Sequence, residues 1–236
     1  MSVRLLQRWT VDAVILDLDG TLVDTVGDFV LALNGMLDAL GPPWRGRRVQ
    51  PAQVACIVGQ GTEHLLHSVL TQMQPAIGAM NSVAWQALWR RAYPYYLRRY
   101  TAINGDAARC YPGVQAGVRG LRQLGLPLAC VSNKPLVLAE GLLRRKRLRS
   151  SLSLVLGGDS LPRKKPDPMP LQHACSVLGV KPSRCLVVGD SRNDAQAARA
   201  AGCPVALLPY GYNHGEPVRA VDADAYLQRL TDLLPR

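Results

Sequence analysis

The chain has 236 residues, of which 48% are hydrophobic, and a formal net charge of +11 at pH 7. This length suffices for a sizeable core, in one domain or in a domain with an insertion, and no stretch reaches the roughly 20 apolar residues of a membrane span. No signal peptide is evident at the N-terminus. Six scattered cysteines without a CxxC pair are typical of buried free thiols in a reducing compartment, so we expect a cytoplasmic protein without a membrane partner.

The positive charge permits two interpretations, a nucleic-acid-binding surface or a basic surface around an anionic substrate. The densest basic run, RRKRLRS at residues 144–150, falls on a predicted helix and lacks the interleaved aromatic residues of a single-strand-binding surface. Arginine and lysine are good helix formers on exposed faces. We therefore expect a solvated helix face there, and nucleic-acid binding is the remote alternative.

Short apolar runs predict five strands, and segments with helical periodicity lie between most of them. In residues 113–125, for example, Val114, Val118, Leu121 and Leu124 recur at helical spacing. Strands that are apolar throughout and alternate with helices are typical of a parallel sheet covered on both faces. The sequence thus predicts a doubly wound α/β fold. Its strands are expected at residues 13–17, 127–131, 153–157, 185–189 and 204–208.

Residues 24–106 interrupt this alternation. They hold three helix-like stretches, with a Pro-, Gly- and Arg-rich segment between the first two, and no convincing strand. An insertion of this length after the first strand indicates a second, all-α-helical domain. We expect a discontinuous α/β core of residues 1–23 and 107–236, a helical cap of residues 24–106, and a hinge into the cap at Asp24 and Thr25.

Polar side chains follow four of the predicted strands. Ligands of open α/β sheets bind at the carboxyl ends of the strands, so these residues should meet at one edge. One such loop would be no more than a helix cap, but four converging loops are hard to explain in that way. The loops carry Asp17, Asp19, Gly20 and Thr21; Ser132, Asn133 and Lys134; Lys164 and Lys165; and Asp190, Ser191, Asn193 and Asp194.

The residue types in these loops complement one another. Asp17, Asp19 and Asp190 would repel strongly without a cation between them, and their oxygens are the ligands that Mg²⁺ prefers. The Ser132 hydroxyl, backbone N–H groups at a helix start and a lysine would cradle a phosphate. Together they predict phosphoryl transfer, in which one aspartate attacks phosphorus to form an aspartyl-phosphate.

Four motifs resemble, in order, those of the haloacid dehalogenase superfamily. They are DLDGT at 17–21, VSN at 131–133, KKPDP at 164–168 and VVGDSRND at 187–194. The resemblance spans the whole predicted core and implies its doubly wound fold. The helical insertion resembles the α-helical C1 cap of that superfamily.

The resemblance implies a role for each acidic motif residue. Asp17 would be the nucleophile and a Mg²⁺ ligand. Asp19 would be the general acid and then the base that activates water, with its backbone carbonyl on the metal. Asp190 would complete the metal shell, and Asp194 would brace it.

The remaining motif residues would serve the phosphoryl group. Ser132 and Asn133 would hold its oxygens, and Lys165 would neutralise developing charge and orient Asp17. The KPDP alignment favours Lys165 over Lys164, which we expect to be a solvated neighbour. We interpret residues 191–193 mostly as a helix start.

An acid two residues after the nucleophile implies a phosphatase or a phosphomutase, because the dehalogenases lack it and the P-type ATPases carry Thr there. The stretches at 126–135 and 157–171 and the tail PYGYNHGEP at 209–217 resemble bacterial phosphoglycolate phosphatases, which implies hydrolysis of 2-phosphoglycolate to glycolate and phosphate. A phosphatase for a sugar phosphate or nucleotide, or a phosphomutase, is the alternative. We expect a small anionic phosphate ester as the substrate, and a monomer or homodimer.

The cap and the tail leave further alternatives open. In GQGTEH at 59–64, Thr62 or Glu63 could face the substrate, although a helix start capped by Thr62 is favoured. His64 and His67 share a helix face without a third ligand nearby, so we expect no metal there. The aromatic run at 85–100 is expected to pack rather than to stack on a ligand. The tail is either an active-site element or a structural turn.

Overall fold

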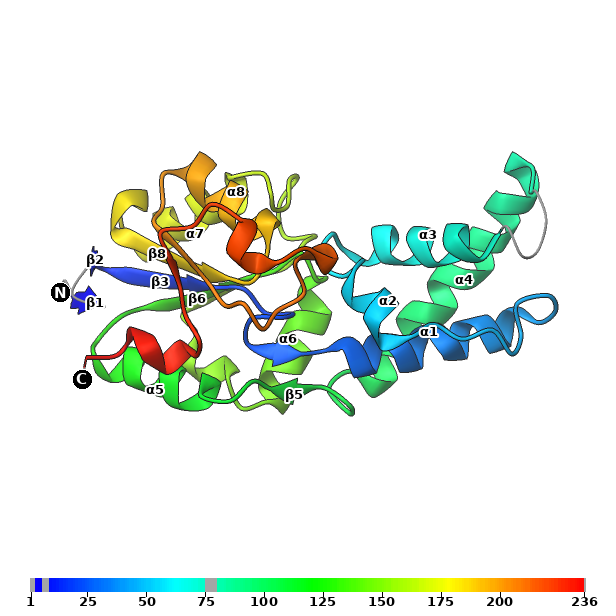
Figure 1. Cartoon of the computed structure of the whole chain (residues 1–236), viewed down its shortest axis with the longest axis horizontal. Coiled ribbons are helices and arrows are strands. Elements are labelled where there is room, and N and C mark those ends of the chain that lie inside the picture. Colours follow the sequence, from blue (N-terminus) through cyan, green and yellow to red (C-terminus); the bar gives the residue numbers. More distant parts are fainter. Residues whose placement is uncertain (1–2, 6–8, 75–79, 236) are drawn as a thin grey trace.

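The computed structural model describes residues 3–5, 9–74 and 80–235. The chain forms two lobes, a sheet flanked by helices and an elongated helical lobe (Figure 1). Within the described residues, no helix has the length and apolar character that a membrane crossing requires. Residues 1–2 and 6–8, in the N-terminal segment where we expected no signal peptide, lie outside the described residues. Residues 75–79 of the predicted cap also lie outside them.

The core contains a six-stranded parallel sheet with strand order β10-β9-β8-β3-β6-β7. All five predicted strands are present, each within two residues of its expected bounds. The edge strand β10 was not predicted, because two residues carry no periodicity. The strands are β3 (Ala13–Leu16), β6 (Leu128–Val131), β7 (Leu154–Leu156), β8 (Cys185–Gly189), β9 (Val205–Leu207) and β10 (Ala225–Tyr226).

Helices cover both faces of this sheet, as its continuously apolar strands require. Val14 and Leu16 of β3 belong to the hydrophobic cluster on one face, and Ala13 and Ile15 to the cluster on the other. The doubly wound α/β fold is therefore confirmed. On the first face lie α5 (Val114–Gln123) and α6 (Leu136–Arg145), and on the second lie α7 (Met169–Leu178) and α8 (Arg192–Ala201).

Two short antiparallel pairs accompany the main sheet. β1 (Val3–Leu5) pairs with β2 (Trp9–Val11), and β4 (Val23–Asp24) pairs with β5 (Arg109–Cys110). The second pair joins the two segments that connect the core to the helical lobe. Its two-residue strands were too short to be predicted.

The helical lobe has its own hydrophobic cluster, separate from those of the sheet. The predicted all-α-helical cap is confirmed, whereas its boundaries at 23/24 and 106/107 stay a prediction. The second of the three helix-like stretches of the insertion, VACIVGQGTEHLLHSVLTQM at 54–73, is interrupted at Gly59 and Gly61, whose φ values are +109° and +93°. The cap helices are α1 (Val26–Leu40), α2 (Pro51–Ala55), α3 (Thr62–Met73) and α4 (Ser82–Ile103).

The segment 104–108, which returns from the cap to the core, is held from two sides. The buried Asp28 accepts hydrogen bonds from three of its backbone N–H groups at 2.6, 2.7 and 3.1 Å. Lys146 donates to two of its carbonyl oxygens at 2.8 and 2.6 Å, and Arg145 to a third at 3.1 Å. Arg144, Arg145 and Arg147 are exposed, as expected for a solvated helix face, and Arg145 and Lys146 in addition hold the segment that returns from the cap.

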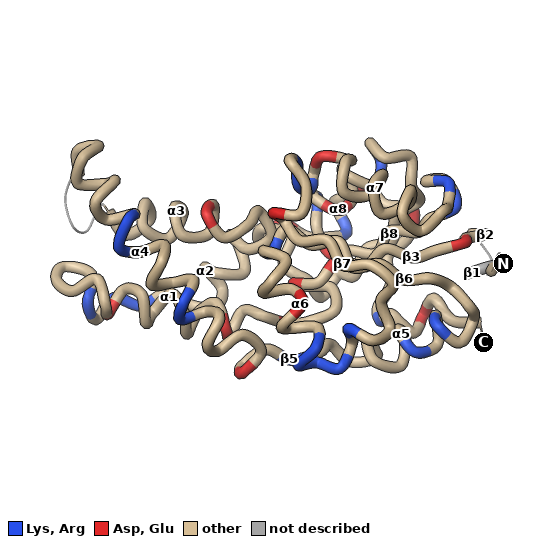
Figure 2. The backbone as a smooth tube through the Cα atoms, turned by 180° about the vertical axis from the view of Figure 1, so that it is seen from behind, with Lys and Arg blue, Asp and Glu red and all other residues tan. Residues whose placement is uncertain are grey.

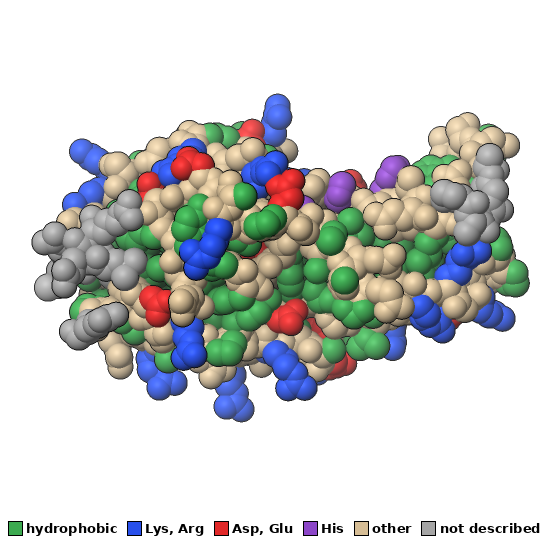
Figure 3. Space-filling view, in the orientation of Figure 1, with side chains coloured by type: hydrophobic (Ala, Val, Ile, Leu, Met, Phe, Trp, Pro, Cys, Tyr) green, Lys and Arg blue, Asp and Glu red, His purple; other side chains and the backbone are tan. Residues whose placement is uncertain are grey.

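Charged residues are dispersed over the molecule. Lys and Arg occur along both lobes with Asp and Glu among them (Figure 2), and no uniformly basic patch is visible on the face in Figure 3.

All six cysteines are free. Four are buried as expected, but Cys56, which ends the cap helix α2, is exposed, and Cys110, in the short strand β5, is partly exposed.

Candidate active site

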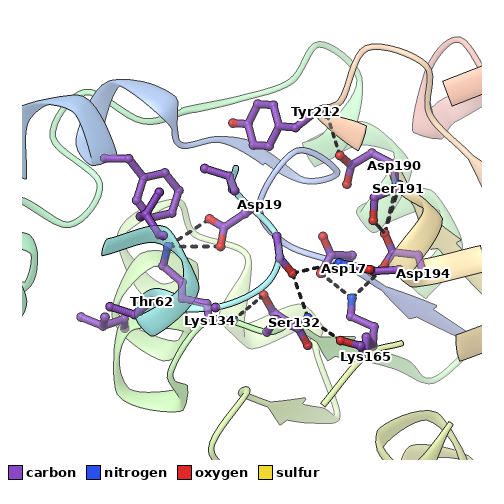
Figure 4. A pocket seen from close by; sticks show the side chains of 18 of the residues that line it. Asp17, Asp19, Thr62, Ser132, Lys134, Lys165, Asp190, Ser191, Asp194 and Tyr212 are labelled. Atoms are coloured by element: carbon purple, nitrogen blue, oxygen red, sulfur yellow. Dashed lines mark hydrogen bonds and ion pairs between the residues drawn. The ribbon is translucent and has the colours of Figure 1, made fainter. Parts of the chain in front are cut away.

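A pocket of about 40 Å³ lies at the carboxyl ends of the central strands, under the cap. Residues of both lobes line it, and all seven predicted site residues are among them. Figure 4 shows Asp19 and Lys134 on one side of Asp17, with Lys165, Asp190 and Asp194 on the other. The predicted residues are Asp17, Asp19, Ser132, Asn133, Lys165, Asp190 and Asp194.

Asp17 directly follows β3 and is fixed by the neighbouring strand. Its backbone N–H donates to the Val188 carbonyl at 2.9 Å, and its Oδ1 accepts a hydrogen bond from Lys165 Nζ at 2.6 Å. Burial raises the pKa of Asp17 to about 7, an effect that the Lys165 charge opposes and the Asp194 charge increases. The carboxyl is thus a buried group held by one cation.

Lys165 joins three acceptors at the floor of the pocket. Its Nζ donates to Asp17 Oδ1 at 2.6 Å, to Asp194 Oδ1 at 2.6 Å and to the Val131 carbonyl at 2.7 Å. Burial alone would lower its pKa, but the two carboxylate charges outweigh burial and raise the pKa above its ordinary value. Lys165 therefore stays cationic beside Asp17.

The neighbouring Lys164 has a different place. It is exposed, and its Nζ donates to the Gln60 carbonyl of the cap at 2.8 Å. Lys164 is therefore more than the solvated neighbour that we expected, because it contacts the other lobe.

Asp194 braces the loop that carries Asp190. Its Oδ2 accepts hydrogen bonds from Ser191 Oγ at 2.6 Å, from the Ser191 N–H at 3.2 Å and from the Asp190 N–H at 3.3 Å. Ser191 is the N-cap of α8, so the predicted helix start is confirmed. With its Oδ1 on Lys165, Asp194 has both oxygens engaged within the protein.

The acidic residues fit a divalent cation. Asp17, Asp190 and Asp194 each offer an oxygen within 4.8 Å of the others. Burial, followed by the charges of Asp194 and Asp17, raises the pKa of Asp190 well above its usual range. Lys165 contacts two of these three buried carboxylates, Asp17 and Asp194, and one cation leaves an excess of negative charge. Mg²⁺ would compensate this excess, and carboxylate oxygens are the hard ligands it prefers.

Asp190 is held in position by two further donors. Thr21 Oγ1 donates to its Oδ1 at 2.7 Å, and the Tyr212 N–H donates to its Oδ2 at 2.8 Å. Tyr212 belongs to the PYGYNHGEP tail, which the sequence left undecided between an active-site element and a turn. The tail thus reaches a predicted metal ligand.

Asp19 is paired with a lysine that had no predicted role. Lys134 Nζ donates to the two carboxylate oxygens of Asp19 at 3.0 and 3.2 Å and to Tyr100 Oη at 2.7 Å. The ammonium also lies 4.6 Å from the ring centroids of Phe29 and Tyr100. The available signal was a lysine directly after the Ser132–Asn133 pair. The aromatic run packs as expected, since Tyr96 and Tyr100 are buried in the hydrophobic cluster of the cap, and both side chains also line the pocket.

Ser132 and Asn133 follow β6, as expected. Ser132 Oγ accepts a hydrogen bond from the Lys134 N–H at 3.3 Å. Asn133 Nδ2 donates to the Gly59 and Lys165 carbonyls, each at 2.8 Å. Because both amide hydrogens have backbone partners, Asn133 connects the cap loop to the core here, and its role as a phosphate ligand stays a prediction.

The cap loop contributes Thr62 but not Glu63 to the pocket lining. The helix start predicted here is confirmed, because α3 begins at Thr62, but its N-cap is Gly61, so the expectation that Thr62 caps the helix is wrong. His64 and His67 contact hydroxyl groups on their own helix, Ser68 Oγ at 3.3 Å and Thr71 Oγ1 at 3.4 Å. Among the residues that the structure describes, the cluster able to hold a metal consists of aspartates, without either histidine.

Comparisons with known proteins agree with this site. The sequence pattern of the haloacid dehalogenase-like hydrolases matches residues 11–202. The chain is 40% identical to a phosphoglycolate phosphatase of Thiobacillus denitrificans, over 94% of this chain and 93% of that protein. It is 44% identical to a phosphoglycolate phosphatase of Nitrosospira multiformis, over 93% and 92% of the two chains. It also resembles the crystal structure of a predicted phosphoglycolate phosphatase from Haemophilus somnus, with a TM-score of 0.86 and 30% identity over 94% of this chain and 96% of that one.

The chain belongs to the haloacid dehalogenase-like hydrolase family. Within this family it is a phosphatase, as the relatives that match nearly its whole length are. The resemblance carried by the four motifs is thereby confirmed.

Proposed function

We propose that the chain hydrolyses 2-phosphoglycolate to glycolate and phosphate, with Mg²⁺ and through an aspartyl-phosphate on Asp17. The names of the similar proteins support this substrate. Within the pocket, the position of Lys134 is the observation that supports the proposal most directly. Of the described lining residues, Lys134 and Lys165 are the two cations, and Lys165 is engaged by Asp17 and Asp194.

Lys134 is suited to the carboxylate of the substrate. It is 5% exposed, and its partners Asp19 and Tyr100 both face the pocket. A hydrogen bond between a buried ammonium and a carboxylate is stronger than one between neutral groups.

Asp17 and Asp190 would hold the metal together with the Asp19 backbone carbonyl, and Asp194 would brace them. Bound there, Mg²⁺ would offset the negative charge of the phosphoryl group and let it approach a carboxylate nucleophile. Lys165 would supply a second positive charge on the same side, within 2.6 Å of Asp17 Oδ1.

The chemical steps follow from the two aspartates. Asp17 attacks phosphorus and forms the acyl-phosphate bond, while the phosphorus–oxygen bond to glycolate breaks and Asp19 gives its proton to the leaving oxygen. Asp19, now a base, takes a proton from water. The resulting hydroxide attacks phosphorus, releases phosphate and restores the Asp17 carboxylate. Lys134 helps to keep Asp19 in place between the two steps.

A panel of phosphate esters tests the proposal. We expect kcat/KM for 2-phosphoglycolate to exceed that for hexose phosphates and nucleoside monophosphates, and activity to disappear with EDTA and return with Mg²⁺. A higher kcat/KM on a hexose phosphate would favour the alternative sugar-phosphate phosphatase. Release of an isomerised sugar phosphate without free phosphate would identify a phosphomutase.

The partners, the compartment and the assembly of the enzyme stay predictions. Nucleic-acid binding through the basic surface would show affinity that falls steeply with salt and is unchanged in Asp17→Asn. The dispersed charges of Figure 2 do not favour it. The cytoplasm stays the expected compartment, and a monomer or homodimer the expected assembly.

A further inference from the structure

The PYGYNHGEP tail at 209–217 forms a tight turn between the two lobes. Asn213, His214 and Gly215 have φ values of 35°, 55° and 82°. Part of this turn has a structural purpose. Asn213 Oδ1 accepts a hydrogen bond from the N–H of Arg192 at the start of α8, at 2.8 Å, and Asn213 Nδ2 donates to the Glu216 carbonyl at 3.0 Å. Asn213 therefore stabilises the turn and the start of α8.

Tyr212 makes contacts that a structural turn does not need. Its backbone N–H donates to Asp190 Oδ2 at 2.8 Å. Its hydroxyl accepts a hydrogen bond from the Thr25 N–H at 2.7 Å and donates to Asp24 Oδ1 at 2.8 Å. One residue thus connects a carboxylate of the candidate metal site with the segment that leads into the cap.

The packing around Tyr212 leaves little freedom between these two ends. A Cβ atom on the preceding Gly211 would lie 2.1 Å from Asp190 Cβ, so the chain approaches this carboxylate as closely as glycine permits. Tyr212 also lines the pocket. A tyrosine side chain has only two soft dihedral angles, so it transmits a displacement of its hydroxyl to its backbone better than a long flexible chain would.

The opposite side of the cap is docked independently. The Gly59 carbonyl accepts a hydrogen bond from Asn133 Nδ2 at 2.8 Å, and the Gln60 carbonyl accepts one from Lys164 Nζ at 2.8 Å. The cap is therefore held at its loop by the phosphate-binding side of the core, and at its hinge by Tyr212. A shift of the cap would change both contacts.

We infer that Tyr212 is a positioning residue that couples the seating of the cap to the position of Asp190, so that Mg²⁺ and the phosphoryl anion bind cooperatively. This inference rests on the proposed metal-dependent phosphatase and adds to it a route between hinge and metal site. Binding of the anion under the seated cap would fix the hinge. The Tyr212 hydroxyl would then hold the backbone N–H on Asp190 and favour the metal-binding arrangement. Coupling between two ligands is reciprocal.

The test is Tyr212→Phe, which keeps the ring and the backbone N–H but removes both hinge contacts. Isothermal titration of Mg²⁺, with and without saturating inorganic phosphate, gives the factor by which phosphate tightens Mg²⁺ binding. We expect this factor to fall about fivefold or more, the effect of losing such hydrogen bonds. Some coupling should persist, because the two ions would also attract each other directly.

Tyr226→Phe is the matched control. It removes a tyrosine hydroxyl that donates to the Val221 carbonyl, away from the hinge and the pocket. We expect it to keep the wild-type coupling factor. Steady-state kinetics provides a second readout. Tyr212→Phe should raise KM for the ester and for Mg²⁺, while kcat at saturation of both stays within about twofold of wild type.

Asp24→Ala removes the carboxylate that accepts the hydrogen bond of the Tyr212 hydroxyl. If the Tyr212 hydroxyl acts through Asp24, the coupling losses of the two single variants should not add in the double variant. Full additivity, an unchanged coupling factor in Tyr212→Phe, or a wild-type protein in which phosphate does not alter Mg²⁺ affinity would overturn the inference. The proposed function fails separately, if the wild type releases no phosphate from 2-phosphoglycolate with Mg²⁺.

Discussion

The two lysines of the pocket differ in their partners. Lys165 is bound by two carboxylates and a carbonyl, and these contacts assign it to the nucleophile. Lys134 pairs with Asp19 under the rings of Phe29 and Tyr100. One carboxylate engages Lys134, whereas two engage Lys165. Lys134 therefore has the less compensated charge of the two and is the lysine suited to bind a substrate anion.

Replacement of this lysine tests carboxylate recognition. Lys134→Met keeps the length of the side chain and removes the charge. We expect kcat/KM for 2-phosphoglycolate to fall about 10- to 100-fold, as for a lost hydrogen bond to a charged group. Activity on ethyl phosphate, which has no carboxylate, should change much less. Initial rates on the two esters give the comparison.

The control for this variant is Lys181→Met, which removes an equal charge at an exposed position. It should leave both activities unchanged. Equal losses on the two esters in Lys134→Met would show that Lys134 only orients Asp19, and would contradict its role in substrate selection.

Most of the candidate site could be predicted because its residues follow strands within short motifs. Asp17, Ser132 and Asp190 are examples, and the fold brings their loops to one edge. The place of Lys134 could not be predicted, because it depends on the aromatic rings of cap helices whose position over the sheet the sequence does not define. The contacts of Tyr212 depend on the path of an irregular turn, which has no periodicity.

At the scale of elements, the loop after β8 and the tail after β9 pack against each other without spare volume. A Cβ on Gly211 would lie 2.1 Å from Asp190 Cβ and 2.3 Å from Asp190 Oδ2. Each loop follows one of two parallel strands, β8 and β9, that are hydrogen-bonded to each other. Their spacing is therefore set by the sheet and cannot relax easily.

Gly211→Ala should push Asp190 out of place. We expect a loss of about 1–3 kcal/mol in the free energy of unfolding, typical of overpacking, and a larger loss of activity than of stability. Gly35→Ala in α1 is the control, since a Cβ there would meet only Arg99 side-chain atoms at 3.6 Å or more. It should stabilise the protein by about 0.4–1 kcal/mol. Urea unfolding measures both variants, and an unaffected Gly211→Ala would contradict this packing.

Strands were predictable where a run is apolar throughout. The strands β3, β6 and β8 have four or five buried residues, and each was found. The three-residue strands β7 and β9 were also found, whereas β1, β2, β4 and β5 were missed because polar residues interrupt them. The break between α2 and α3 falls at GQGTEH, where the sequence favoured a helix start, and the positive φ values at Gly59 and Gly61 separate the two helices.

For the molecule as a whole, the buried carboxylates oppose folding. The pKa of Asp190 is raised in the folded state, so the native protein binds more protons than the unfolded chain above the ordinary pKa of a carboxyl. Stability contributed by this group therefore falls as pH rises. At about pH 8 without a cation, the site should be a net cost to stability, and Mg²⁺ should remove much of that cost.

Asp190→Asn separates the cost of burying this carboxylate from the stabilisation that Mg²⁺ would give. The amide can still accept from the Tyr212 N–H and can donate to Thr21 Oγ1, so its contacts are retained. In EDTA we expect its melting temperature to exceed that of the wild type by several degrees, about 2–4 °C for each kcal/mol. Addition of Mg²⁺ should raise the melting temperature of the wild type but hardly that of the variant. Equal stabilisation of both proteins by Mg²⁺ would exclude Asp190 as a ligand.

Phosphoryl transfer to Asp17 is tested most directly by the mass of the Asp19→Asn protein after incubation with acetyl phosphate and Mg²⁺. Acetate is a weak base and leaves without a proton, whereas water is no longer activated by residue 19, so the phosphoryl-enzyme should persist. We predict a gain of one phosphoryl group on the peptide that contains Asp17, absent from the Asp17→Asn/Asp19→Asn variant. An unmodified Asp19→Asn protein, under conditions in which the wild type hydrolyses acetyl phosphate, would contradict the mechanism.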